Sequence, residues 1–314
     1  MPIIFRAGVW KPRTSPNTFQ GAGEQALAWL QEVKKTFGME IATEVATPEH
    51  VQKALDACID YLWLGARTTA NPIAVQELAD AIVAHSHKPK AILVKNPVHN
   101  DPELWIGDLE RLEAKGLSVI AVHRGCNHKP CWAMAHHLRE KRPDIPLLID
   151  PSHMSGNAQY ISALLAKAAE LQYDGSMIEV HPCPGNALSD SKQQITPDQY
   201  KQIVNGSISS QSRTNLEPIT RDKAEQKDNS TLLWLRAEID ELDDQLWQTI
   251  ADRMKVSQRI GEWKKANHIA PLQPQRYAQI LAERLQWAEQ NGLSQELIQH
   301  IFDAIHKESL KKQE

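Results

Sequence analysis

Basic residues follow short apolar runs throughout the first two thirds of this 314-residue chain. They are Arg6, Lys11, Arg13, Arg67, Lys95 and Arg124. Bases gathered at the ends of apolar strands repel one another unless they meet anions. The pattern therefore predicts a pocket for a compound with more than one phosphate or carboxylate group. The alternative is a set of unrelated, solvated surface bases.

A second group of residues could hold a metal ion. His153, Glu179 and Asp190 follow the last two apolar runs and combine imidazole nitrogen with carboxylate oxygen. This donor set suits divalent Mn, Fe, Co or Zn. An ion beside an anion pocket would polarise a carbonyl group as a Lewis acid. The alternative is a buried trio joined by salt bridges.

Seven apolar runs, separated by helical stretches, must position these side chains. They cover residues 3–5, 40–45, 61–65, 91–94, 119–122, 147–149 and 177–180. Such runs are typical of parallel strands that are buried on both faces. Polar residues end almost every run, which favours a (β/α) barrel over a doubly wound sheet, since a barrel gathers all its strand ends at one rim.

The last third of the chain is predicted to be helical. Apolar residues recur at three- and four-residue steps and predict one helix over 231–266, followed by shorter helices over 275–291 and 294–312. The apolar stripe of the long helix exceeds what the short helices can cover, so we expect an intertwined dimer or a higher homo-oligomer. Arg253 and Lys264 share one face of this helix, whereas Arg236 lies about 100° away. Arg236 could therefore complete a basic pocket in the other copy; the alternative is an ordinary charged face.

Composition separates the two regions. Glycine and proline become rare after about residue 206, and residues 206–229 are polar without apolar periodicity. We therefore predict a barrel domain over 1–205, a linker over 206–229 and a helical domain over 230–314. The net charge of −4 excludes a general attraction to nucleic acid or to anionic membranes. No run is long enough to span a bilayer, and four cysteines do not form a disulfide framework, so we expect a cytoplasmic protein.

Several motifs of the first region resemble a known enzyme family. They are FRAGVWKPRT at 5–14, GART at 65–68, VKNP at 94–97, HRG at 123–125, DPSH at 150–153, EVHP at 179–182 and LSD at 188–190. Their order is similar to that in the type I-beta 3-deoxy-D-arabino-heptulosonate-7-phosphate (DAHP) synthases. That family is a TIM-type (β/α)8 barrel that condenses phosphoenolpyruvate with erythrose 4-phosphate and releases phosphate.

The resemblance also implies roles for single residues. Phosphoenolpyruvate would be held by Arg6, Arg67, Lys95 and Arg124, with Lys95 also acting in catalysis. The sugar phosphate would be held by Lys11, Pro12, Arg13 and Thr14, and the metal by His153, Glu179 and Asp190. The family has an earlier strand with a Pro-Cys-Ser motif, whose cysteine is a further metal ligand, and this sequence begins after it. We therefore expect a barrel without its first strand. The alternative is an inactive barrel joined to a helical domain that acts as a mutase or as a dimerising, prephenate-sensing regulatory module.

The helical region resembles the AroQ-type chorismate mutases. The similarity rests on LRAEID at 235–240, ADR at 251–253, Lys264, Arg276 and ESLKKQ at 308–313. It implies rearrangement of chorismate to prephenate, with a site formed by Arg236, Arg253, Lys264, Arg276, Ser309 and Gln313. Arg236 would come from the other subunit. This reaction needs positioning and charge stabilisation rather than a nucleophile.

Overall fold

The fold is described from a computed structural model that covers residues 3–13, 17–213 and 223–313. The chain divides into two compact units, Met1–Glu238 and Ile239–Glu314. Within the described ranges, no helix has both the length and the apolar character needed to cross a membrane.

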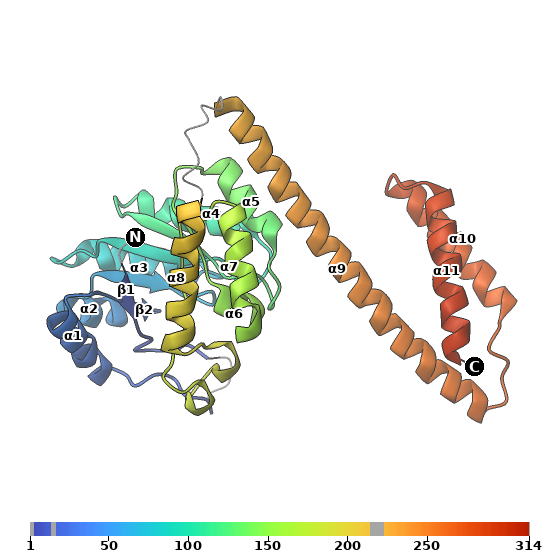
Figure 1. The fold of residues 1–314 in the computed structure, drawn as a ribbon, viewed down its shortest axis with the longest axis horizontal. Helices are drawn as coiled ribbons and strands as arrows, with labels where there is room; N and C mark the ends of the chain where they lie inside the picture. The colour runs from blue at the N-terminus through green and yellow to red at the C-terminus, as the bar shows by residue number, and fades with distance from the viewer. Residues whose placement is uncertain (1–2, 14–16, 214–222, 314) are drawn as a thin grey trace. The chain divides into compact units, whose positions relative to one another are not determined.

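The first unit is built on a curved sheet of seven parallel strands (Figure 1). The strands are β1 (Ile4–Arg6), β2 (Glu40–Val45), β3 (Tyr61–Leu64), β4 (Ala91–Lys95), β5 (Val119–His123), β6 (Leu147–Ile149) and β7 (Gly175–Ser176). Each strand pairs with the next one along the chain, and the described strands end at β1 on one edge and β7 on the other. A doubly wound sheet would reverse its strand order at one point. The barrel-type fold is therefore confirmed, with seven strands in place of eight.

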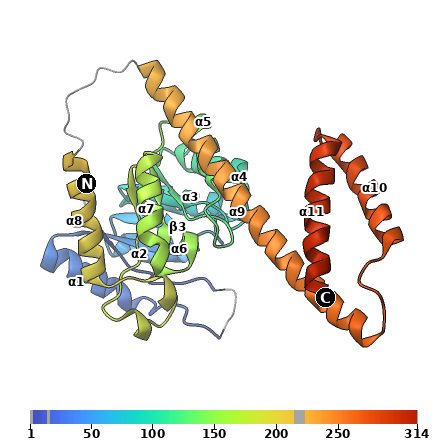
Figure 2. The same cartoon turned by 45° about the vertical axis from the view of Figure 1, so that its right-hand side comes forward.

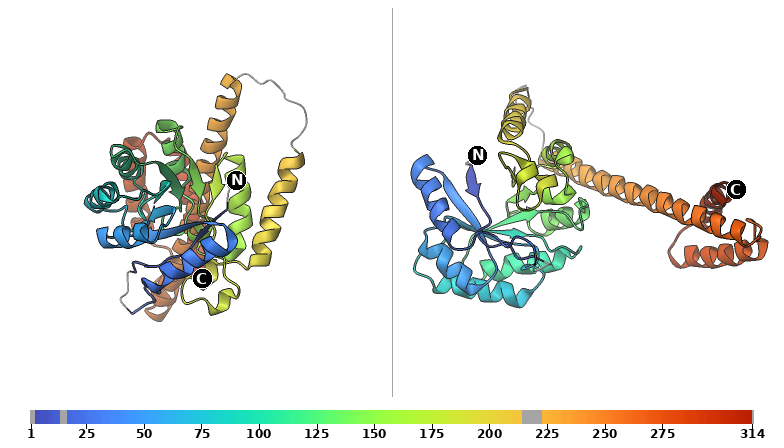
Figure 3. Two further views of the ribbon diagram at one scale, coloured as in Figure 1. Left: turned by 90° about the vertical axis from the view of Figure 1, so that its left-hand side faces the viewer. Right: turned by 90° about the horizontal axis from the view of Figure 1, so that it is seen from below.

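Helices follow the strands, and most of them lie on the outer face of the curved sheet (Figure 3). They are α1 (Gln25–Phe37), α2 (Pro48–Asp56), α3 (Pro72–Ala84), α4 (Pro102–Glu113), α5 (Trp132–Lys141), α6 (Pro151–Ser155), α7 (Ile161–Glu170) and α8 (Pro197–Arg213). These helices occupy the helical stretches that the sequence predicts between its apolar runs.

Short polar signals set the beginnings of three of these helices. Thr47, Asn71 and Asp101 each precede a proline, and each side chain accepts a hydrogen bond from a main-chain N–H of the first turn. An N-cap side chain accepts from a main-chain N–H of the first turn that has no partner within the helix. Proline fits the first helical position because the N–H of that position would also lack a partner. The helices therefore begin directly after the loops that carry the strand-end residues.

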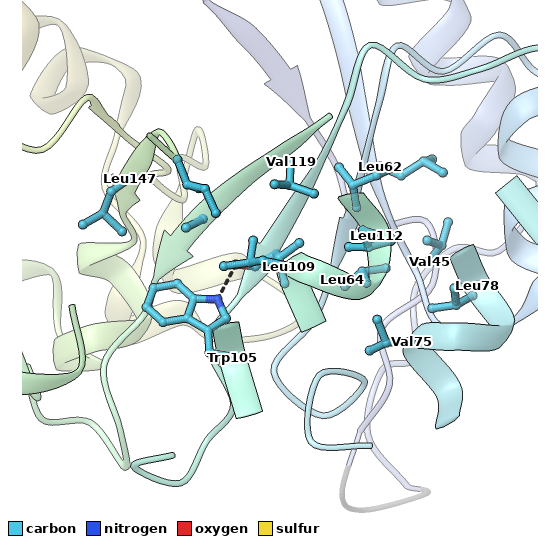
Figure 4. Packing of buried hydrophobic residues seen from close by; sticks show 14 of the residues in the cluster. Val45, Leu62, Leu64, Val75, Leu78, Trp105, Leu109, Leu112, Val119 and Leu147 are labelled. Atoms are coloured by element: carbon cyan, nitrogen blue, oxygen red, sulfur yellow. Dashed lines mark hydrogen bonds between the residues drawn. The ribbon is translucent and has the colours of Figure 1, made fainter. Parts of the chain in front are cut away.

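Buried side chains form two clusters on opposite faces of the sheet. The larger cluster joins strand residues such as Leu62 and Leu64 to the helices, and the Trp105 indole donates a 3.0 Å hydrogen bond to the Val94 carbonyl within it (Figure 4). The smaller cluster contains Trp63 and lines the inside of the curve. Its buried members are Ala42, Trp63, Leu93, Val122 and Met177. Alternate residues of a strand point to opposite faces, so the inner strands are largely buried on both faces, as the continuous apolar runs predicted.

The last predicted run is displaced in the structure. Strand β7 covers Gly175–Ser176, whereas the sequence predicted a strand over 177–180. The Met177 N–H still bonds to the Ile149 carbonyl, but the Glu179 N–H bonds to the Ser152 hydroxyl at 3.0 Å. The chain leaves the sheet because a side chain replaces the strand partner at Glu179.

The helical region consists of α9 (Lys223–Ala266), α10 (Pro274–Gln290) and α11 (Gln295–Gln313). In the second unit α10 and α11 lie side by side (Figure 2). Helix α9 begins at Lys223 rather than at residue 231, and α8 continues to Arg213, so helix extends into both ends of the predicted linker. Residues 214–222 of that linker lie outside the described ranges.

The first turns of α9 that belong to the first unit pack against its outer helices. Trp234 is 5% exposed and stacks on His136 of α5, with ring centroids 5.7 Å apart. Glu238 accepts a 2.5 Å hydrogen bond from the His136 ring. Ala237 is fully buried in the same cluster. The start of α9 is thus part of the core of the first unit.

Candidate functional sites

Strand register places the polar side chains at the rim of the sheet. Leu93 and Val122 point to the inside of the curved sheet. Residues two positions apart on a strand share a face, so the same step leads from them to Lys95 and Arg124. The same step leads from Ile4 to Arg6 on the first strand. It also yields Glu44 on β2, Asp150 directly after β6 and Glu179 in the segment after β7. The carboxyl-terminal rim therefore carries both bases and acids.

Lys95 lies in a buried ion pair. Its ammonium group is 2.8 Å from Asp150 Oδ2, and its side chain is 6% exposed. Burial alone would raise the pKa of the Asp150 carboxyl, but the charges of His153 and Lys95 outweigh that effect and hold it well below its usual range. Asp150 therefore keeps its negative charge and fixes the Lys95 side chain at the strand end.

Arg124 and Arg67 belong to the same rim. The Arg124 side chain donates to the Gly125 carbonyl at 3.4 Å, and its main-chain N–H donates to Asn96 Oδ1 at 2.7 Å. Burial lowers the pKa of the Arg124 guanidinium, although arginine stays charged at neutral pH. Arg67 donates a 3.2 Å hydrogen bond to the Pro12 carbonyl, which ties the third strand's loop to the loop after β1.

Arg6 connects the first strand to the segment after the last one. Its guanidinium lies 3.3 Å from Glu179 Oε1 and 5.4 Å from the centre of the Trp63 ring. Burial raises the pKa of Glu179, but Arg6, His153 and a 2.8 Å hydrogen bond from Gln193 together lower it. Glu179 is therefore a carboxylate that is available to a cation.

The predicted metal ligands separate into a pair and a single residue. His153 Nε2 lies 3.8 Å from Glu179 Oε1, and its other nitrogen contacts Asp150 at 2.9 Å. Asp190 instead binds Lys11 at 3.0 Å and accepts two hydrogen bonds from Arg13, at 3.1 and 2.8 Å. Burial opposes ionisation of Asp190, but these two bases lower its pKa well below the usual range.

The fit of these residues to a metal ion is therefore partial. The His153 imidazole and the Glu179 carboxylate converge and form a mixed nitrogen and oxygen donor pair of the kind that divalent transition metals accept. Over the described ranges, no group of three His, Cys, Asp or Glu side chains is arranged to hold an ion.

The predicted sugar-phosphate residues share one loop. Lys11, Pro12 and Arg13 lie together after β1, and the Lys11 ammonium also donates to the Ser189 hydroxyl at 2.8 Å. Thr14 lies outside the described residues. The loop therefore faces the Ser189 and Asp190 segment.

Sequence reasoning missed two acids of the rim as site residues. Asp150 appeared only as the first residue of the DPSH motif, three residues before the predicted ligand His153, and Glu44 lies inside an apolar run. The structure packs Glu44 so close to Gly65 that a Cβ on Gly65 would lie 2.1 Å from its carboxylate. Glu44 lies two residues after Ala42, which points inward. This spacing puts Glu44 on the same face and could have identified it from the sequence.

In the second unit, α9 and α11 bring four predicted residues together in two pairs. Arg253 donates a 2.5 Å hydrogen bond to the Ser309 hydroxyl, and Lys264 donates a 3.0 Å hydrogen bond to Gln313 Oε1. Burial lowers the pKa of Arg253. Arg276 lies at the start of α10 and contacts Gln279 at 3.1 Å.

Arg236 belongs to the part of α9 within the first unit. It is exposed there, between the buried Trp234 and Ala237.

His306 was also missed. Its ring lies 4.5 Å from that of Tyr277, and burial, followed by the charge of Arg253, lowers its pKa. Its Nε2 atom is buried without a hydrogen-bond partner in the described part of the chain. A neutral imidazole therefore lies beside the Arg253 pocket.

Comparison with known proteins agrees with both halves of this description. Residues 1–215 match the DAHP synthetase I family, and residues 235–314 match the chorismate mutase type II family. Both families are named for enzymes, one a transferase and the other an isomerase.

Individual relatives match the first region. A phospho-2-dehydro-3-deoxyheptonate aldolase of Thermotoga maritima is 30% identical over 208 residues, which cover 64% of this chain and 59% of the relative. The crystal structure of a DAHP synthase from Thermotoga maritima matches with a TM-score of 0.59 and 28% identity, covering 67% of this chain and 61% of that one. A 2-dehydro-3-deoxyphosphooctonate aldolase of Edwardsiella ictaluri is 25% identical over 209 residues, covering 60% of this chain and 71% of the relative.

The chain thus spans less than two thirds of the length of the Thermotoga aldolase. Three observations nevertheless point to the same family. They are the rim of bases and acids, the strand order, and the match to one family model over about two thirds of the chain. On these grounds the chain belongs to the DAHP synthetase I family and continues into a region of the chorismate mutase type II family.

Proposed function

We propose that the first region condenses phosphoenolpyruvate with erythrose 4-phosphate to give DAHP and phosphate. The observation that carries this proposal is the buried Lys95 ammonium, held by Asp150 at the rim beside Arg124. A desolvated base of this kind binds an anion strongly, because little water competes for it. Arg6, Lys95 and Arg124, together with Arg67 in the following loop, come from four strand units and match a substrate that carries a phosphate and a carboxylate.

The loop residues Lys11, Pro12, Arg13 and Thr14 would bind the phosphate of the sugar. Holding the two substrates together brings C3 of the enol to the aldehyde carbon, and that carbon–carbon bond forms first. Water then adds at C2, and phosphate leaves with its bridging oxygen as the C–O bond breaks. The bases offset the repulsion between the two anions, so the chain acts chiefly by positioning and charge stabilisation.

We assign His153 and Glu179 as the residues that would hold a divalent Mn, Fe, Co or Zn ion, and Asp190 would join them only on release from Lys11 and Arg13. Such an ion would polarise the aldehyde oxygen. Lys11 and Arg13 contact Asp190, and this supports a phosphate-binding loop next to that residue.

The second unit is proposed to rearrange chorismate to prephenate. Arg253, Lys264, Arg276, Ser309 and Gln313 would bind the two carboxylates and the ether oxygen, and Arg236 would be donated by the other subunit. An exposed apolar stripe on α9 supports dimer formation. Leu242 is 63% exposed and Leu246 is 47% exposed on that stripe, which a second copy of the helix would cover.

We place both reactions in the cytoplasm, a reducing compartment, since within the described ranges no cysteine forms a disulfide.

Two assays on the full chain test the pair of activities. Purified protein with a divalent metal should release phosphate from phosphoenolpyruvate when erythrose 4-phosphate is added, and it should convert chorismate to prephenate. A five-carbon sugar phosphate serves as the competing acceptor, because an eight-carbon product requires it. Faster phosphate release with the five-carbon sugar would reassign the first region to the octonate reaction, and no release with either sugar would refute the synthase proposal.

A further inference from the structure

A stacked pair of rings supports the basic loop after β1. The Trp10 indole and the His50 imidazole are 4.1 Å apart at their centroids and only 4° from parallel. Trp10 immediately precedes Lys11, and His50 lies in the first turn of α2. Two segments 40 residues apart in sequence therefore meet at the residue before the predicted sugar-phosphate loop.

His50 is held rigidly on its own helix. Its main-chain N–H donates to the hydroxyl of the N-cap Thr47 at 3.2 Å, and its ring Nδ1 accepts a 3.3 Å hydrogen bond from the Ala46 N–H. An Nδ1 atom that accepts from a main-chain N–H belongs to a neutral ring. Burial lowers the pKa of His50 and outweighs the nearby Glu49 carboxylate, which agrees with a neutral ring. The imidazole is therefore a fixed, uncharged platform.

The main chain on either side of Trp10 is fixed as well. The Val9 N–H bonds to Thr43 Oγ1 at 3.3 Å, and the Lys11 N–H bonds to the Gln20 carbonyl at 2.7 Å. Gly21 has a φ of 99° and passes so close to Val9 that a Cβ would lie 2.2 Å from its carbonyl oxygen. These bonds set the path of the loop, and the ring stack holds its outer side chain against α2.

The loop carries the two bases that meet Asp190. The Lys11 and Arg13 side chains both reach Asp190 Oδ2, at 3.0 and 2.8 Å. A fixed main chain between them lowers the entropy cost of bringing two long side chains from one loop to a single acceptor. Stacked aromatic rings contribute about 0.5–1.5 kcal/mol beyond the area they bury, which is enough to select one loop position.

We propose that His50 is a positioning residue for the sugar-phosphate loop, acting through its stack on Trp10. The inference rests on the proposed synthase function. His50 is not among the residues proposed to bind either substrate, and it contacts only the loop through Trp10. Its loss should therefore weaken binding of the four-carbon sugar phosphate and spare the phosphoenolpyruvate group at Lys95.

The test compares His50→Ala with His50→Phe in the full chain. His50→Ala removes the platform, whereas His50→Phe keeps a flat ring and removes only the Nδ1 acceptor. The Michaelis constant for erythrose 4-phosphate should rise about tenfold in His50→Ala and return to within about threefold of the parent in His50→Phe. The Michaelis constant for phosphoenolpyruvate and kcat should stay within about twofold. His137→Ala is the matched control, because it removes an exposed histidine that pairs with Glu103 on the outer helices.

A second pair of variants keeps the test decisive if His50→Ala folds poorly. Trp10→Ala removes the stack from the other side, Trp10→Phe retains it, and calorimetric titration with erythrose 4-phosphate measures binding without turnover. The double variant His50→Ala/Trp10→Ala should bind no more weakly than Trp10→Ala alone, because both changes remove the same contact. Additive losses, equal effects on both substrates, or failure of the phenylalanine variants to restore binding would each overturn the proposal. A parent chain that neither binds nor turns over the sugar phosphate would instead refute the synthase function, and the positioning role with it.

Discussion

Gly261 of α9 lies directly against Gln313 of α11, so closely that a Cβ on Gly261 would be 2.5 Å from Gln313 Cα. This contact brings the two helices together at the point where Lys264 meets Gln313. Gly261→Ala should therefore push the helices apart and destabilise the second unit by about 1–3 kcal/mol, with a matching loss of mutase activity. Urea unfolding followed by circular dichroism and the chorismate assay measures both effects.

The matched control for this prediction is Gly107→Ala. Gly107 lies within α4, and an added Cβ would meet nothing within 4 Å. Alanine should stabilise that helix by up to about 1 kcal/mol, because it is the better helix former. Equal effects of the two substitutions would show that the α9–α11 crossing tolerates a side chain.

The Lys95–Asp150 pair can be used to separate binding from folding. Lys95→Met should weaken phosphoenolpyruvate binding by roughly 10- to 100-fold, since charge-assisted hydrogen bonds contribute about 1.5–3 kcal/mol. It should also destabilise the first unit, because it leaves the buried Asp150 carboxylate without its partner. The double variant Lys95→Met/Asp150→Asn should regain stability but not affinity. Calorimetric titration and thermal unfolding report the two properties, and affinity that recovers together with stability contradicts a direct role for Lys95.

Asp108 of α4 should make stability depend on pH. Its carboxylate is fully buried, has no hydrogen-bond partner among the described residues, and burial raises its pKa to about 7. In the unfolded chain the same group titrates near pH 4. The folded state therefore retains the proton that the unfolded state loses, and the free energy of unfolding should fall as pH rises from about 4 to 7.

Asp108→Asn removes this dependence, since the amide is neutral at every pH. We expect the variant to match the parent near pH 4 and to exceed it above pH 7, by up to about 4 kcal/mol. The exposed Asp80, which pairs with Lys115, provides the control substitution Asp80→Asn. Urea titrations at pH 4.5, 6 and 8 decide the matter, and parallel pH profiles for parent and variant would contradict it.

The two subunits should share each mutase pocket. Arg236→Ala and Arg253→Ala should each be inactive alone, because every pocket of either homodimer carries one lesion. In a mixed dimer one pocket carries both lesions and the other none, so equal mixing should restore about a quarter of the parent activity. Subunit exchange followed by the chorismate assay tests this. A mixture that stays as inactive as its components places both arginines in one chain.

Removal of metal should distinguish the two activities. A chelator should abolish phosphate release by the first region, because in the proposed reaction a divalent ion would polarise the aldehyde carbonyl. The rearrangement of chorismate is pericyclic and should continue unchanged in the same sample. Addition of Mn or Zn should restore phosphate release. A chelator-resistant synthase would show that His153 and Glu179 hold no required ion.

Positions of the inner strands followed closely from the sequence because these strands are largely buried on both faces. The runs at 40–45 and 147–149 coincide with β2 and β6. Period-two register then places Arg6 and Lys95 at the rim. The run at 177–180 failed for a local reason, since the Ser152 hydroxyl captures the Glu179 N–H and draws the chain out of the sheet.

Pairing between charged side chains could not be predicted in this way. Asp190 fits a metal-ligand pattern as well as it fits two bases, and only the fold reveals that Lys11 and Arg13 lie within 3.0 Å and 2.8 Å of it. The sequence around Trp234 likewise gives no sign that this ring packs against the first unit. Its burial in the first unit depends on α5, whose His136 lies almost a hundred residues earlier.

The ion pair between Arg6 and Glu179 has a consequence for how this chain folds. It joins residues 173 positions apart, at opposite edges of the seven-stranded sheet. Closing a flexible loop of that length costs roughly 4–5 kcal/mol of chain entropy, far more than a partly exposed ion pair returns. Neighbouring strands, which need only short closures, must therefore assemble in sequence before the two edges meet. We expect the rim to be the last part of the first unit to form during refolding and the earliest to open under mild denaturant.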